Sequence, residues 1–225
     1  MLLSHRYRFI YLKIRKTAGT SVEVYLEPFC CTPSLYPGPA MKREALVTGD
    51  GIIGRRMNEP HPPDAFYNHM PAEEVRARVG SAVWDQYQKV SVVRNPFDRA
   101  VSWLWHGLAP KDRARLAAAP FDAVLDAFAR RLENPGKILR DAAVFSIDGR
   151  CILDSWIRYE SLHADLDALS QRLGLPPAPY PLGEYRRDAR VRPEPWQAYV
   201  ERPDIRRRIV DMLRLEFEAF GYPTD

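Results

Sequence analysis

The 225-residue sequence lacks the features that mark disulfide-rich and membrane-spanning proteins. Its three cysteines, two of them adjacent at Cys30 and Cys31, are too few for a disulfide framework and do not have metal-site spacing. No stretch approaches the roughly 18 uncharged apolar residues of a membrane span, and residues 1–8 do not resemble a signal peptide. We therefore expect a cytoplasmic protein without stable membrane insertion.

A strong charge imbalance is also missing. The chain has 33 basic and 29 acidic residues, a formal net charge of +4, which suits a small anionic ligand but is too weak to indicate nucleic acid. The sequence shows no cluster of acidic residues that would indicate a metal site. Hydrophobic residues make up 46% of the chain, enough for a sizeable core, so we expect residues 1–225 to form a single domain.

Hydrophobic patterning predicts strands that alternate with helices. Strands are expected at residues 8–14, 45–47, 66–69, 89–93 and 155–159, and helices at 20–27, from 71, and at 96–105, 121–132, 162–173 and 205–220. Thr20 and Glu23 have capping-box spacing, and Asn95 is expected to cap the helix that begins at Pro96. This alternation predicts an α/β fold with a mostly parallel central sheet flanked by helices.

The segment Lys16–Ser21 has the pattern of an anion-binding loop. It joins a predicted strand to a predicted helix, and unpaired N–H groups and the helix dipole favour negative charge at such a helix start. In the common nucleoside triphosphate loop the lysine follows the second glycine. Here Lys16 precedes Gly19, so the loop fits a phosphate-like group without matching the ATPase pattern.

Further polar residues follow other predicted strands. His69, Arg94 and Arg158 each stand at a predicted strand end, where open α/β sheets bind ligands. Arg94 and the Lys16 loop also precede well-defined helix starts. The sequence therefore predicts two separate anion-binding elements and a ligand with two anionic groups.

Several motifs carry a family resemblance. Residues 15–21 (RKTAGTS) resemble the 5′-phosphosulfate loop of sulfotransferases that use 3′-phosphoadenosine 5′-phosphosulfate (PAPS), and residues 92–102 (VVRNPFDRAVS) resemble their 3′-phosphate element. Residues 67–71, 157–162 and 220–222 resemble segments of the carbohydrate-type, Golgi-like branch and its soluble bacterial relatives. The motifs occur in the family's order.

The resemblance implies a P-loop-like fold, PAPS as co-substrate, no metal, and in-line transfer of a sulfuryl group to a hydroxyl of a carbohydrate or glycoconjugate. It implies that the donor is bound by Arg15, Lys16, Thr17, Ala18, Gly19, Thr20, Ser21, Arg94 and Ser102. Arg187 is a further candidate for donor binding, on the hypothesis that the arginine-rich segment around it closes over the nucleotide. Lys16 is expected to stabilise charge on the leaving side, and His69 to act as general base. His106 is the alternative base.

Other interpretations stay open at this stage. Arg94 could form an ion pair with Asp98 instead of binding a ligand, and Arg158 could be structural. The arginine-rich segment 186–192, with Tyr185 beside it, is either a solvated loop or a lid over the nucleotide or an anionic acceptor. Arg15 replaces a proline common in the family. The competing functions are a divergent P-loop kinase or NTPase and a non-catalytic nucleotide- or glycan-binding protein.

Overall fold

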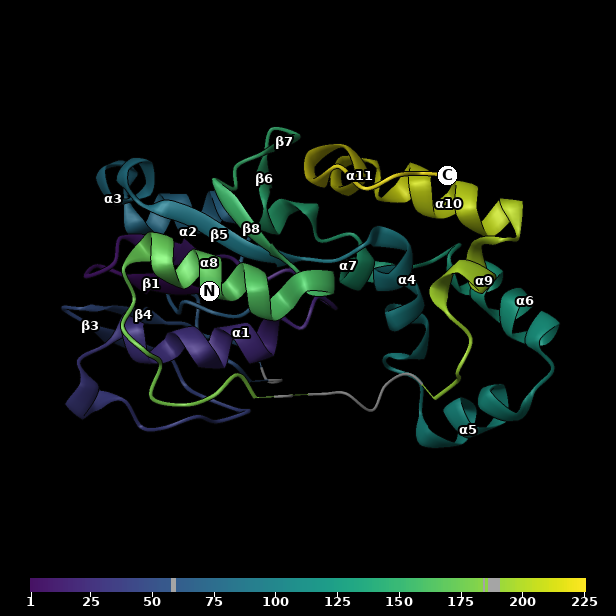
Figure 1. Ribbon diagram of the computed structural model, residues 1–225, viewed down its shortest axis with the longest axis horizontal. Helices are drawn as coiled ribbons and strands as arrows, with labels where there is room; N and C mark the ends of the chain where they lie inside the picture. The colour runs from purple at the N-terminus through teal and green to yellow at the C-terminus, as the bar shows by residue number, and fades with distance from the viewer. Residues whose placement is uncertain (58–59, 184, 186–190) are drawn as a thin grey trace. The chain divides into compact units, whose positions relative to one another are not determined.

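The computed structural model describes residues 1–57, 60–183, 185 and 191–225 (Figure 1). Contacts within this part of the chain define two compact units. Unit 1 comprises the described residues of 1–93 and 142–185, and unit 2 comprises residues 94–141 and 191–225. The expectation that residues 1–225 form a single domain stays a prediction.

Unit 1 contains a six-stranded mixed sheet with the strand order β3-β4-β1-β2-β5-β8. Its strands are β1 (Leu2–Ser4), β2 (Phe9–Tyr11), β3 (Leu46–Thr48), β4 (Gly51–Ile53), β5 (Gln88–Val93) and β8 (Ser155–Arg158), and a separate hairpin pairs β6 (Ser146–Ile147) with β7 (Arg150–Cys151). Strands β2, β5 and β8 are parallel, so their carboxyl ends lie at one edge.

The predicted α/β class is confirmed, but the prediction of a mostly parallel sheet is wrong. Strand β1 pairs antiparallel with β2 and β4, and β3 pairs antiparallel with β4. Strands β1 and β4 were not predicted. Strand β4 lies in a stretch with many glycine and proline residues, which indicates loop, and the apolar run at β1 is very short. Gly51 permits the close approach of β4 to β1, since a Cβ there would lie 2.1 Å from the Leu3 carbonyl oxygen.

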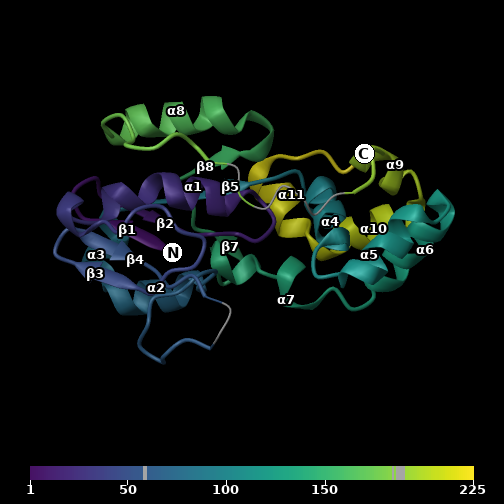
Figure 2. The same ribbon diagram turned by 90° about the horizontal axis from the view of Figure 1, so that it is seen from below.

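Helices cover both faces of this sheet (Figure 2). The helices of unit 1 are α1 (Gly19–Leu26), α2 (Ala72–Val79), α3 (Ser81–Gln86) and α8 (Leu162–Leu173). Val90 and Val92 on β5 share one buried cluster with Val22 of α1 and Leu166 of α8. The alternation along β5 therefore places α1 and α8 on the same face.

Two local predictions for unit 1 are wrong. Residues 66–69 form no strand, because Tyr67 makes only an isolated bridge to Arg55 and His69 adopts a left-handed φ of 57°. The Thr20–Glu23 capping box is also absent. The N-cap of α1 is Ala18, and the Glu23 side chain is fully buried in ion pairs instead.

Unit 2 is helical. Its helices are α4 (Pro96–Trp105), α5 (Pro110–Ala118), α6 (Phe121–Arg131), α7 (Gly136–Leu139), α9 (Trp196–Val200), α10 (Pro203–Met212) and α11 (Arg214–Phe220). The predicted cap of α4 is confirmed, since Asn95 Oδ1 accepts from the N–H groups of Phe97 and Asp98. The single helix predicted over 205–220 is wrong, because the chain leaves helical geometry at Leu213. Among the described residues, no helix has both the length and the apolar character of a membrane span.

Arg99 on α4 joins three parts of unit 2. Its side chain is 1% exposed, and Nη1 donates to Glu216 Oε1 of α11 at 2.9 Å. Nη2 donates to Asp141 and, at 3.3 Å, to the carbonyl oxygen of Leu139 in α7. All three charged side chains are buried, so loss of the guanidinium would remove a positive charge that both buried carboxylates contact.

We therefore expect Arg99→Ala to lower the free energy of unfolding by about 3–5 kcal/mol, the cost of breaking a buried ion pair. Urea unfolding followed by circular dichroism measures this change. Arg208→Ala is the control, because the Arg208–Glu133 pair is solvent-exposed and is expected to contribute at most about 1 kcal/mol. Equal transition midpoints for the two variants would contradict the structural role of Arg99.

Candidate functional site

The segment between β2 and α1 has an unusual backbone. Lys16 and Ala18 adopt left-handed φ angles of 65° and 62°, which few residues other than glycine do. Left-handed residues that alternate with other conformations direct successive N–H groups toward one side and form anion-binding concavities. At the start of α1, the N–H groups of Gly19 and Thr20 have no partner within the helix. Residues 15–21, here called the phosphate loop after the motif that they resemble, thus have a backbone that can bind an anion.

Buried side chains hold the phosphate loop against β2. Tyr11 Oη donates to the Gly19 carbonyl oxygen at 3.0 Å, and the buried Thr17 Oγ1 donates to the Ile14 carbonyl oxygen at 3.1 Å. The Thr17 hydroxyl proton is therefore used to shape the loop. A Cβ at Gly19 would lie 3.0 Å from Lys13 Cγ and 3.1 Å from Tyr11 Oη. Glycine at this position allows the helix to start close to the strand.

The Ser21 hydroxyl has a different environment. Ser21 Oγ accepts from the backbone N–H of Tyr185 at 3.3 Å, so its own proton is not used in that bond. The contact joins α1 to the segment before the arginine-rich region. Arg187, predicted to bind the donor, lies outside the described residues, as do the neighbouring positions 186 and 188–190.

His69 lies directly beside the segment that leads into the phosphate loop. Its Nδ1 is 2.7 Å from the Lys13 carbonyl oxygen. A carbonyl oxygen can only accept, so we assign the proton to Nδ1, which leaves a lone pair on Nε2. Burial, followed by the positive charges of Lys13 and Arg15, holds the pKa of His69 well below its usual value. The imidazole is therefore neutral at neutral pH, the form that a general base requires.

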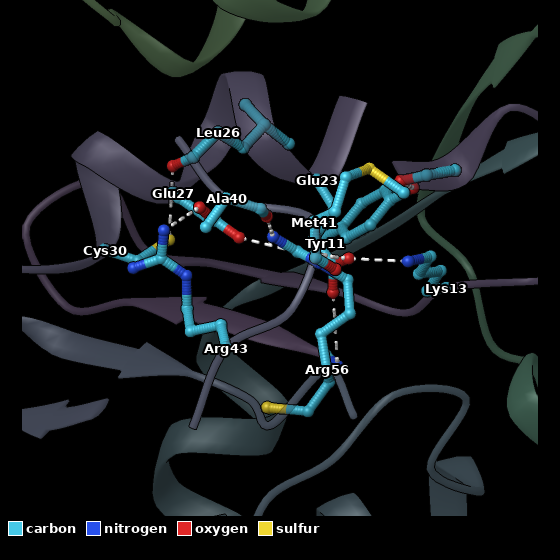
Figure 3. Close-up of polar contacts among 12 residues, drawn as sticks. Tyr11, Lys13, Glu23, Leu26, Glu27, Cys30, Ala40, Met41, Arg43 and Arg56 are labelled. Carbon is cyan, nitrogen blue, oxygen red and sulfur yellow. Dashed lines mark hydrogen bonds and ion pairs between the residues drawn. The ribbon is translucent and has the colours of Figure 1, made fainter. Parts of the chain in front are cut away.

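A buried charge cluster lies next to this loop (Figure 3). It consists of Lys13, Glu23, Glu27, Arg43 and Arg56. Glu23 Oε2 contacts both Lys13 Nζ, at 2.6 Å, and Arg56 Nη1, at 2.7 Å. Burial alone would raise the pKa of Glu23, but the nearby positive charges lower it to about 2. The carboxylate is thus ionised inside the protein.

This cluster was not predicted from the sequence. Its visible signal is the placement of charged residues within apolar runs: Lys13 stands between Leu12 and Ile14, and Glu23 between Val22 and Val24. A charge in such a context is buried only when it has a partner. The partner Arg56, however, lies 33 residues beyond Glu23, in a segment without a regular pattern.

The second predicted anion element lies in unit 2, at the start of α4. Arg94 Nε and Nη2 both lie 2.8 Å from Asp98 Oδ2, so the ion pair considered as an alternative is present. Ser102 lies two helical turns further along α4 and is half-buried. His106, the alternative base, directly follows α4 in unit 2.

The remaining sequence candidates are placed as follows. Arg158 ends β8, and its backbone N–H donates to Asp165 Oδ2 at 2.8 Å. Arg192 bonds to Glu194 and to the Ala117 and Ala119 carbonyl oxygens within unit 2. In the described part of the chain, His, Cys, Asp and Glu side chains form no group of three or more that could hold a metal ion.

Comparison with known protein families matches residues 1–131 to the model described as the sulfotransferase family. No curated protein and no solved structure shows a significant match. The matched region covers more than half of the 225 residues and includes the phosphate loop, His69 and the start of α4. The chain therefore belongs to the sulfotransferase family.

Proposed function

We propose that this protein transfers a sulfuryl group from PAPS to a hydroxyl of a carbohydrate or glycoconjugate by in-line displacement. Family membership supports sulfuryl transfer in general. One observation supports the mechanism in particular. The neutral imidazole of His69 is hydrogen-bonded to the Lys13 carbonyl oxygen, directly before the phosphate loop. The carbohydrate acceptor and a P-loop-like donor site are taken from the motif resemblance.

The phosphate loop fits the phosphosulfate end of this donor. A Cβ at Gly19 would meet Lys13 and Tyr11, so glycine at this position lets α1 start close to β2. The first-turn N–H groups of α1 and the Ser21 hydroxyl supply donors for oxygen atoms. Bound here, PAPS would supply the sulfuryl group as an activated mixed anhydride.

The residues of the loop and His69 have complementary roles in the proposal. Lys16 supplies a positive charge, which stabilises negative charge that develops on the leaving side. His69 accepts the proton of the acceptor hydroxyl at Nε2 and makes the oxygen a stronger nucleophile. Arg15 and Lys13 both place a positive charge near the imidazole, and these charges help to keep His69 neutral.

Arg94 and Ser102 are proposed to bind the 3′-phosphate. Arginine can donate two parallel hydrogen bonds to a phosphate, and Ser102 adds a hydroxyl from the same helix. The Asp98 carboxylate competes for the Arg94 guanidinium, so phosphate binding requires exchange or sharing of that ion pair. Arg187 is proposed as a further nucleotide contact.

Nucleotide binding provides the first test. We expect adenosine 3′,5′-bisphosphate to bind without Mg²⁺, and Lys16→Ala to weaken that binding by about 10- to 100-fold, because a hydrogen bond to a charged group contributes roughly 1.5–3 kcal/mol. Isothermal titration calorimetry with and without Mg²⁺ measures both effects. Lys42→Ala, at an exposed lysine of unit 1, is the control.

The same titrations separate the competing functions. Mg²⁺-dependent ATP binding without affinity for the bisphosphate would indicate a kinase or NTPase and contradict the proposal. Bisphosphate binding without transfer to any of a broad set of polysaccharides and oligosaccharides would indicate a non-catalytic binding protein.

His69→Ala tests the assignment of the base. We expect turnover to fall by about 100-fold or more with unchanged affinity for adenosine 3′,5′-bisphosphate, because general-base catalysis acts on the chemical step. Transfer of a radiolabelled sulfuryl group from PAPS to the acceptor set gives the turnover, and His163→Ala, at an exposed position, is the control. Loss of nucleotide binding would make His69 structural, and unchanged turnover would exclude it as base.

A further inference from the structure

Lys13 contacts three parts of the candidate site at once. Its carbonyl oxygen accepts from His69, and its ammonium group donates to Glu23 of α1 at 2.6 Å. Its Cγ lies 3.0 Å from the position that a Cβ on Gly19 would occupy. Lys13 is 4% exposed, so these contacts occur inside unit 1.

We propose that Lys13 is a positioning residue that fixes His69 as the Nδ1–H tautomer and ties it to the phosphate loop. The proposal rests on the proposed function, because it assumes that His69 accepts the acceptor proton. Lys13 itself does not contact the reacting atoms. It acts through the imidazole and through α1.

The main-chain contact determines which imidazole nitrogen can act as base. The Lys13 carbonyl requires a donor, so Nδ1 carries the proton and Nε2 keeps its lone pair. His69 makes this contact from a left-handed backbone conformation, and Met70, the next residue, is buried. The strained backbone at His69 is therefore held in place by the bond of its own side chain to Lys13 and by the burial of the next residue, Met70.

The side chain anchors the same residue to the helix that follows the loop. Lys13 Nζ and Arg56 Nη1 bind one oxygen of Glu23, and all three side chains are at most 5% exposed. Such a pair resists opening, because a single buried charge without its partner is costly. Lys13 precedes the phosphate loop, and Glu23 lies in α1, the helix into which the loop leads. The ion pair therefore holds the two ends of the loop together.

The charges that act on His69 are Lys13 and Arg15, which lower its pKa, and Glu23, which raises it. Lys13 thus contributes a positive charge as well as a carbonyl oxygen. The geometry gives opposite expectations for the two members of the ion pair. Removal of the Lys13 charge favours protonation of His69, and removal of the Glu23 charge disfavours it.

NMR of protein labelled with ¹⁵N-histidine tests both parts of this proposal without substrate. In the wild type we expect the His69 resonances, identified by their loss in His69→Gln, to show a protonated Nδ1 and an unprotonated Nε2 at neutral pH. Lys13→Met should move the protonation midpoint of His69 to higher pH, and Glu23→Gln should move it to lower pH. Lys42→Met, at an exposed lysine, should leave the midpoint unchanged.

A wild-type Nε2–H tautomer, or a midpoint that does not move in Lys13→Met, would overturn the proposal. If Lys13→Met does not fold, as judged by circular dichroism, Glu23→Gln decides, and an unchanged or higher midpoint in that variant overturns the proposal. In the active enzyme, the acidic limb of the pH profile of kcat/KM should follow the NMR midpoint in each variant. Full turnover of His69→Ala with the expected NMR result would instead refute the role of His69 as base, and absence of sulfuryl transfer by the wild type would refute the proposed function.

Discussion

The carboxylate of Glu23 is the interaction on which the geometry of unit 1 depends most. One of its oxygens contacts Lys13 and Arg56, and its side chain is fully buried. Lys13 comes before the phosphate loop, Glu23 lies in the helix after it, and Arg56 comes from the segment that follows β4. A buried carboxylate is stable only among positive charges and donors, so the three segments are held in one arrangement.

In unit 2, the residues of the Arg94 motif serve the fold as well as the proposed ligand. Asn95 caps α4, and Arg99 joins α4 to α7 and α11. Arg94 is engaged by Asp98 one turn away. A motif that resembles a phosphate-binding element therefore contains structural residues, and only part of its sequence is available for recognition.

The elements that could be predicted from sequence are those with a local signal. The apolar run of β5, the cap of α4 and the stripe of α8 are each encoded within a dozen residues, and the structure confirms them. Strands β1 and β4 could not be predicted, because neither has a distinctive local pattern and they pair with each other across a long stretch of sequence. The contact between His69 and Lys13 spans 56 residues, and the left-handed conformations at Lys16 and His69 do not fall on glycine. The assignment of the candidate site to these segments stays a prediction, and its hydrogen bonds and charge cluster could not be read from the pattern.

The position of the charge cluster has a consequence for how such a protein can diverge. Because the phosphate loop is fixed from its buried side, a mutation of a half-buried side chain outside the cluster, such as Tyr67, leaves the internal ion pairs in place. Mutation of a cluster member, in contrast, needs a simultaneous second change to restore charge balance. Residues outside the buried charge cluster can therefore change one at a time, whereas the residues of the cluster must change together.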